Sequence, residues 1–171
     1  MAGAKDKYAN LLVKNFSLSA ANTLTFDEIE IGLSLFDKVG LKIQRLEYHW
    51  SNAALAEMTA NGDDMVCGLI TSDAVSSPGP SESAVIHMTR IKRIDFGTAA
   101  SAQLTKVPDV FDFSNLAGGG LLVTPRPLYA FGNSSGLASA CQFNLRVFFT
   151  VEKLADAEYF ELLETRHYFG Q

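Results

Sequence analysis

Residues 141–164 read CQFNLRVFFTVEKLADAEYFELLE, and this stretch decides the fold class. From Cys141 to Glu152 apolar and polar side chains alternate, which is the period of a strand with one buried face. The side chains assigned to the buried face are Cys141, Phe143, Leu145, Val147, Phe149 and Val151. A strand of this length spans about 36 Å, so we predict a central core strand that crosses a whole β-sandwich.

A short helix is predicted directly after this strand, at residues 156–164. Asp156 is a suitable N-cap and Glu158 lies near the positive end of the helix, while Phe160 and Leu163 share one face. Two roles remain open for this ending. Either the helix covers an open end of the sandwich, or the C-terminal tail at 165–171, with Tyr168 and Phe169, reaches a neighbouring subunit.

Length and composition set limits on the protein class. A chain of 171 residues is the size of one domain, so we expect a single domain over 1–171, with an N-terminal segment at 1–9. Hydrophobic residues make up 47% and charged residues 19%, which favours apolar surface covered by other copies of the chain. A net charge of −5 gives no footprint for nucleic acid. With no signal peptide or membrane-spanning run in the sequence, we expect a soluble protein that is not secreted.

The rest of the chain is dominated by strand patterns. The predicted strands cover 10–19, 23–36, 39–50, 64–72, 84–94 and 119–131, the last of which Pro125 and Pro127 interrupt. A helix is predicted at 52–60, and the loop SSPGPSES at 76–83 is predicted to be exposed outer surface. Many strands, few helices and turns rich in glycine, proline and serine indicate an all-β sandwich or barrel.

Two of the predicted strands change phase part-way along. In 23–36 the apolar positions switch face at Asp27-Glu28, and in 39–50 they switch at Gln44-Arg45. A change of phase by one residue predicts a β-bulge or bend that moves the chain between packing surfaces.

One catalytic motif matches literally. GNSSG, residues 132–136, fits the G-x-S-x-G nucleophile elbow with Ser134 as nucleophile, and Asp156 and His167 follow in the chain order of a hydrolase triad. The elbow needs a helix directly after the serine, whereas here a strand follows. We therefore read the motif as an ordinary loop, assign no catalytic residue and expect no enzyme.

Metal and cofactor patterns are weak. His49, His87 and His167 are too widely spaced for the usual transition-metal motifs, so no metal is assigned. Calcium between subunits remains open, with the carboxylate pairs Asp63-Asp64 and Asp109 with Asp112. Cys67 and Cys141 are interpreted as small buried side chains, although a disulfide between them also remains open.

Two further patterns indicate structure more than ligand binding. The glycines at 118–120 have no accompanying P-loop lysine, so we expect them to permit a tight turn or a close backbone approach, and we assign no cofactor. Arg90, Lys92 and Arg93 lie on a predicted strand, where we expect a solvated face.

Residues 112–164 resemble the C-terminal half of the single jelly-roll coat proteins of small icosahedral viruses. The features that carry the resemblance are an aromatic strand containing arginine, Arg146 to Thr150, and a short YxEL helix, Tyr159 to Leu162. The resemblance implies an antiparallel jelly-roll sandwich of about eight strands whose task is self-assembly into a shell. It departs in two ways: the chain has no basic N-terminal arm, and the link FDKVG at 36–40 predicts a hairpin where a crossing between sheets is expected.

The sequence therefore predicts a viral structural protein that forms an icosahedral capsid. Its expected partners are copies of itself, as pentamers, hexamers or pseudo-hexamers, together with other virion proteins. Its expected location is the virion, and the host cytoplasm before assembly. The alternative is a non-enzymatic carbohydrate- or protein-binding β-sandwich module, which requires an exposed aromatic platform from Trp50, Tyr48 or Tyr129.

Overall fold

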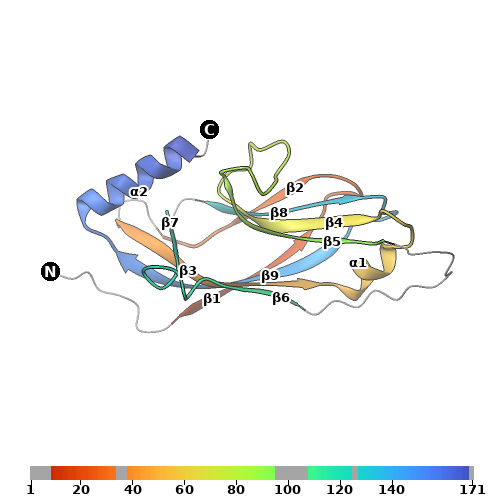
Figure 1. Ribbon diagram of the computed structural model, residues 1–171, viewed down its shortest axis with the longest axis horizontal. Coiled ribbons are helices and arrows are strands. Elements are labelled where there is room, and N and C mark those ends of the chain that lie inside the picture. Colours follow the sequence, from red (N-terminus) through yellow and green to blue (C-terminus); the bar gives the residue numbers. More distant parts are fainter. Residues whose placement is uncertain (1–8, 34–37, 95–107, 125–126, 170–171) are drawn as a thin grey trace.

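The computed structural model describes residues 9–33, 38–94, 108–124 and 127–169, with side chains given as far as Glu164 in the last helix. Two antiparallel sheets are stacked face to face, with a short helix at one end and a longer helix at the other (Figure 1). In chain order the elements are β1 (Asn10–Ser17), β2 (Thr25–Ile29), β3 (Val39–Trp50), α1 (Asn52–Glu57), β4 (Asp64–Ile70), β5 (Val85–Lys92), β6 (Asp109–Asp112), β7 (Leu121–Val123), β8 (Leu128–Ser135), β9 (Gln142–Lys153) and α2 (Asp156–Phe169).

The strand order is that of a jelly roll. One sheet, here sheet A, has the order β1-β9-β3-β6, with β7 also paired to β3; the other, sheet B, has the order β2-β8-β4-β5. β6 and β7 pair with successive stretches of the same edge of β3, so together they fill one strand position. When the eight positions of the described strands are numbered in chain order, with β6 and β7 together as position 6, the order is 1-8-3-6 in sheet A and 2-7-4-5 in sheet B. This interleaving of two Greek keys confirms the predicted fold class.

The core lies between the sheets and is filled by their inward faces. β9 sits between β1 and β3, as predicted for a central strand, and Phe143, Leu145 and Val147 are at most 4% exposed. Both long edges of the sandwich are closed by contacts between sheets. At one edge Lys14 of β1 pairs with Asp27 of β2 at 2.8 Å.

At the other long edge, β5 of sheet B faces β6 of sheet A. Thr89 donates a hydrogen bond to the Asp109 carboxylate, and the ring centroids of His87 and Phe111 are 3.8 Å apart. Tyr48 from β3 lies behind these rings with no exposed surface. A polar and aromatic seam therefore joins the sheets where the apolar core ends.

The two predicted phase changes have different origins. In β3 the pairing with β9 shifts register between Ile43 and Arg45, so the bulge predicted at Gln44-Arg45 is confirmed. In β2 the pairing with β8 is continuous, and the bulge predicted at Asp27-Glu28 is wrong. Phe26 there packs on the outer side of sheet B beside Phe131, while Asp27, whose side chain is 45% exposed, pairs with Lys14 of β1 at the edge of the sandwich.

Two connections differ from the sequence-based expectations. The predicted hairpin at 36–40 is wrong, since β2 lies in sheet B and β3 in sheet A; β2 ends at Ile29, and the chain turns out of the sheet through Gly32 at a φ of +69°. Residues 34–37 of this link lie outside the described part. The predicted strand at 119–131 is divided between the sheets, with β7 in sheet A and β8 in sheet B, on either side of the two prolines.

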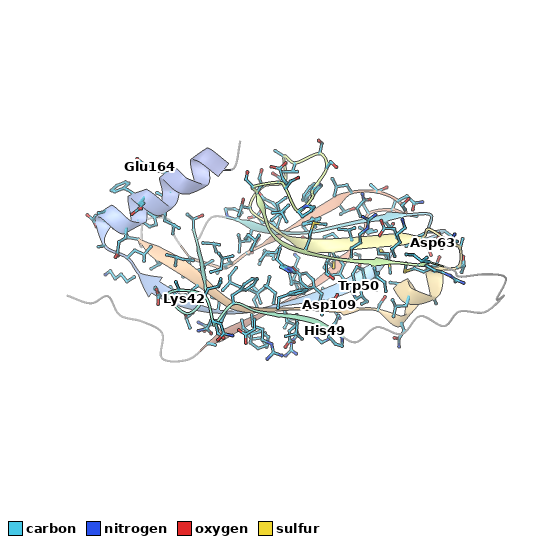
Figure 2. The ribbon with its side chains drawn as sticks, in the orientation of Figure 1. Lys42, His49, Trp50, Asp63, Asp109 and Glu164 are labelled. Atoms are coloured by element: carbon cyan, nitrogen blue, oxygen red, sulfur yellow. The ribbon has the colours of Figure 1, made fainter. Side chains whose placement is uncertain are left out.

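The glycines at 118–120 serve the turn that precedes β7. All three have positive φ, and a Cβ on Gly120 would lie 2.6 Å from Cγ of Lys42 and 2.8 Å from the carbonyl oxygen of Ile43. The predicted close backbone approach is thus confirmed. This turn covers Lys42, which is 8% exposed and pairs with Glu152 on the outer side of sheet A (labelled in Figure 2).

Both predicted helices form. α1 begins after Ser51, whose hydroxyl accepts a hydrogen bond from the Ala54 N–H at 3.0 Å. α2 extends to Phe169, beyond the predicted 156–164. Asp156 is its first helical residue and not the residue before it; its carboxylate pairs with Lys38, and the Glu158 carboxylate accepts the Ala155 N–H.

Candidate interaction surfaces

The outer face of sheet A carries a set of side chains aligned across four strands. In one row Val13 of β1 is opposite Arg146 of β9, which is opposite Glu47 of β3, which is opposite Val110 of β6. The next row contains Leu11, Phe148, Arg45 and Asp112. Outward positions on neighbouring strands lie about 5 Å apart, so these residues form one continuous patch, called here the sheet A patch.

Glu47 is the electrostatic centre of the sheet A patch. Its side chain is 6% exposed and pairs with Arg45, with Arg146 at 3.1 Å and with His49 at 3.3 Å. Burial raises the pKa of the Glu47 carboxyl, but the hydrogen bond with His49 and the charges of Arg45 and Arg146 outweigh burial and hold the pKa below its usual value. The carboxylate therefore fixes two guanidinium groups on an otherwise open face.

Apolar groups surround this charged centre. The guanidinium carbons of Arg45 and Arg146 lie 5.3 Å and 5.5 Å from the centre of the Phe148 ring, within the range of cation–π interaction. Leu11, Val13 and Val110 are 47%, 54% and 48% exposed on the two edge strands. The outer face of a solvated antiparallel sheet is normally polar, so three exposed aliphatic side chains in two adjacent rows indicate a contact surface.

A second surface is found on α2. Tyr159 is buried and Leu162 and Leu163 are half-buried, so these residues face the body of the protein. On the opposite stripe Ala157, Phe160, Glu161 and Glu164 are all exposed, Phe160 to 59%. An exposed aromatic ring flanked by carboxylates, with spacings of three and four residues, forms a defined stripe called here the α2 stripe.

The sequence placed Phe160 and Leu163 on one face of the helix, but in the structure Leu163 faces the body of the protein and Phe160 is exposed. The sheet A patch was missed. Its signal is the pattern of alternating charge RLEYH at 45–49 together with RVF at 146–148. The pattern gains meaning only once β9 is known to pair with β3 in a register that sets Arg146 opposite Glu47.

The hydrolase reading of Ser134 has no support in the geometry. The ordinary loop expected at 132–136 is wrong, because residues 132–135 belong to the antiparallel strand β8. Ser134 is 6% exposed, and its hydroxyl accepts the Asn22 N–H at 2.9 Å. Asp156 pairs with Lys38 at the start of α2, and the side chain of His167 lies outside the described part. The strand-to-helix turn that an elbow requires is not formed at Ser134.

The candidate metal ligands are separated and have protein partners. His49 contacts Glu47, and His87 packs against Phe111; no group of three potential ligands gathers among the described side chains. The proposed calcium carboxylates are also engaged. Asp63 accepts the Ala60 N–H, Asp64 binds Arg90, Asp109 accepts from Thr89, and Asp112 accepts the Ser114 N–H.

The remaining sequence candidates fall into structural roles. Arg90 pairs with Asp64 across the β4–β5 ladder, and Arg93 donates to the Met58 carbonyl at 2.6 Å, so these two basic residues hold chain segments together and are not a simple solvated face. Cys67 and Cys141 are both buried, as expected, and no disulfide joins them. The loop at 76–83 is largely exposed, as predicted.

The predicted aromatic platform is not formed. Tyr48 has no exposed surface, the Trp50 ring packs at 6.0 Å from Phe143 with its indole nitrogen buried, and Tyr129 packs with Phe131 on sheet B. The positions of Trp50 and of His49 on sheet A are labelled in Figure 2.

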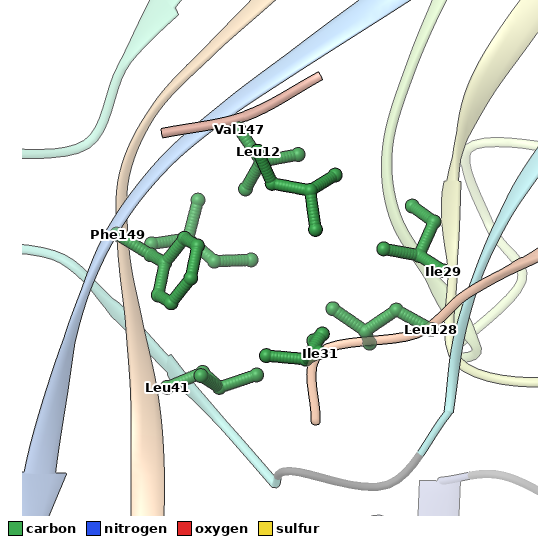
Figure 3. A pocket seen from close by; sticks show the side chains of 8 residues that line it. Leu12, Ile29, Ile31, Leu41, Leu128, Val147 and Phe149 are labelled. Carbon is green, nitrogen blue, oxygen red and sulfur yellow. The ribbon is translucent and has the colours of Figure 1, made fainter. Parts of the chain in front are cut away.

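A cavity between the sheets is too small to bind a ligand. Figure 3 shows its lining of Leu12, Ile29, Ile31, Leu41, Ile43, Leu128, Val147 and Phe149, all apolar. Its volume of about 10 Å³ is that of one water-sized sphere, and an apolar lining offers water no hydrogen-bond partner. Among the described residues no helix is long and apolar enough to cross a membrane.

Comparisons with known proteins find likeness at the level of structure. No protein-family model matches the sequence, and no curated protein is similar to it. The VP1 pentamer of human polyomavirus 6 is similar over 88% of this chain and 97% of that chain, at 10% identity and a TM-score of 0.43. Desmodium yellow mottle tymovirus is similar over 88% and 93%, at 10% identity and a TM-score of 0.34.

These two are viral capsid proteins. The VP2 subviral particle of infectious bursal disease virus is similar over 88% of this chain and 39% of that chain, at 12% identity and a TM-score of 0.22. At such identities a likeness concerns the fold alone. The jelly-roll assignment of this chain stands on its own strand order.

Proposed function

We propose that this protein is a viral structural protein that assembles with copies of itself into an icosahedral capsid. The observation that carries the proposal is the sheet A patch, in which exposed aliphatic side chains on both edge strands flank arginines fixed by a nearly buried carboxylate. A protein that stays monomeric leaves such a face exposed to solvent. A shell subunit buries it in repeated contacts between copies.

The fold and the resemblance of residues 112–164 to single jelly-roll coat proteins indicate the kind of assembly. The proposed partners are other copies, grouped as pentamers, hexamers or pseudo-hexamers, and other virion proteins. The proposed locations are the virion and, before assembly, the host cytoplasm. The proposed role is mechanical and involves neither catalysis nor a cofactor.

The test is the mass and shape of the purified full chain across salt and pH. Light scattering after size exclusion gives the mass, and negative-stain imaging gives the shape. We expect closed shells, rings of five or six, or sheets of capsomers. A monomer or trimer of 18.6 kDa chains under every condition would overturn the proposal, and a glycan array would then test the binding-module alternative.

A further inference from the structure

We infer that the α2 stripe of one copy docks on the sheet A patch of a second copy. This inference rests on the proposed function and names the surfaces that join neighbouring subunits. Both surfaces expose apolar groups beside charge, and their charges are opposite. The α2 stripe offers Phe160 with Glu161 and Glu164, while the part of the sheet A patch on β1, β9 and β3 offers Leu11, Val13 and Phe148 with Arg146 and Arg45.

The charge balance of the sheet A patch favours an acidic partner. Arg45 and Arg146 are 46% and 37% exposed, whereas the Glu47 carboxylate that fixes them is 6% exposed. Asp112 is the other exposed acid of the patch, and it lies beyond Arg45 on the β6 edge. Toward β1 and β9, an approaching carboxylate therefore meets guanidinium groups already held in place.

The spacings of the two surfaces also agree. Phe160 and Glu164 are one turn apart on the helix, which separates their side chains by about 6 Å. Val13 and Arg146 are paired positions on neighbouring strands, about 5 Å apart. A helix lying across β1 and β9 can therefore place the Phe160 ring over Leu11 and Val13 while Glu164 reaches Arg146.

The contact joins different copies because one copy carries the two surfaces on different sides. Figure 2 shows Glu164 at the α2 end, beyond the side of the sandwich formed by sheet B, whereas His49 lies on the outer side of sheet A. Two unlike surfaces make a heterologous contact, so every copy can receive one neighbour and dock on another. Such contacts close into rings or extend into arrays.

The test is a mixing experiment with the full chain. Variant one, Phe160→Glu, removes the apolar anchor of the α2 stripe and leaves the sheet A patch intact. Variant two, Leu11→Glu with Val13→Glu, adds carboxylates to the sheet A patch and leaves α2 intact. Ile94→Glu, at a side chain that is 58% exposed and outside both surfaces, is the matched control. Circular dichroism and thermal unfolding establish that each variant folds.

We expect Ile94→Glu to assemble like the wild type and each of the other variants to remain monomeric alone. An equimolar mixture of the two should give a 1:1 complex of twice the 18.6 kDa chain mass and nothing larger, because each complex has one functional contact. Assembly of Phe160→Glu alone, or a mixture that stays monomeric, would overturn the inference while wild-type assembly upholds the proposed function. A wild type that never assembles defeats the proposed function itself.

A crosslinking measurement covers the case in which a variant fails to fold. Phe160→Cys combined with Val13→Cys should form an oxidised ladder of linked copies, since the native Cys67 and Cys141 are at most 4% exposed. Each single cysteine variant should stay unlinked. Dimers of Phe160→Cys alone would show helix-to-helix contact and contradict the inference, as would a double variant that forms no ladder.

Discussion

At the scale of single residues, the seam between β5 and β6 shows how burial lowers the pKa of a histidine. The His87 ring packs on Phe111 and near Tyr48, with Asp109 in the same seam. Burial lowers the pKa of His87, and the nearby Asp109 carboxylate offsets only part of this effect. His87 is therefore harder to protonate in the folded chain than in the unfolded chain.

This difference in the pKa of His87 makes the stability of the fold depend on pH. A folded pKa below the unfolded value, which is about 6.5, means that the contribution of His87 is present above pH 6.5 and declines as pH falls toward the folded pKa. We expect urea unfolding of the wild type to show lower stability at pH 5.5 than at pH 7.5. His87→Gln should show a smaller difference between the two values, and an unchanged difference would contradict this account.

Val147 tests the inward face of β9. It is 4% exposed and lines the small cavity, so Val147→Asp buries a carboxylate without a partner. A cost of about 4 kcal/mol or more is expected, enough to unfold most of the chain. The matched control is Asn144→Asp on the exposed outer face of the same strand, which should keep wild-type stability. A folded, soluble Val147→Asp protein would refute the inward assignment.

At the scale of elements, the sequence patterns predicted features that depend on a single strand better than features that depend on contacts between strands. The alternation in β9 was enough to predict its buried side chains, and the phase change in β3 was enough to predict its bulge, because each pattern reflects one continuous buried face. The phase change in β2 misled, since Asp27 pairs with Lys14 of β1, the preceding strand, which lies in the other sheet. β6 was missed because the four residues Asp109–Asp112 are too short for a period to be detected.

Gly68 tests a close approach within sheet B. A Cβ at this position would lie 2.4 Å from the Phe131 ring and 2.5 Å from the His87 carbonyl oxygen, so neither the ring nor the backbone has room for it. Gly68→Ala should therefore destabilise the protein by about 1–3 kcal/mol through overpacking. Gly79→Ala, where the nearest atom lies 4.0 Å away, should change stability by less than about 0.5 kcal/mol. Equal midpoints in urea for the two variants would contradict the expected overpacking.

At the scale of the whole molecule, the sequence predicted the fold class but not which strands share a sheet. A short link with a turn residue looks the same whether it joins neighbours in one sheet or crosses to the other, and here Lys38 sits at a φ of +49° just before β3. The sheet A patch was hidden for the same reason. Val13, Arg146, Glu47 and Val110 are far apart in sequence and become one row only through the order β1-β9-β3-β6.

Assembly through the α2 stripe and the sheet A patch should depend on salt. The exposed carboxylate of Glu164 and the guanidinium groups attract over distances that salt screens, with a Debye length of about 10 Å at 0.1 M and about 3 Å at 1 M. We expect the protein concentration needed for assembly, measured by light scattering, to rise between 0.1 M and 1 M NaCl. Glu164→Gln keeps the shape of the helix but loses the charge, so it should need more protein at 0.1 M and respond less to added salt. Equal salt responses in the two proteins would mean that Glu164 forms no ion pair in the contact and that apolar burial alone holds the copies together.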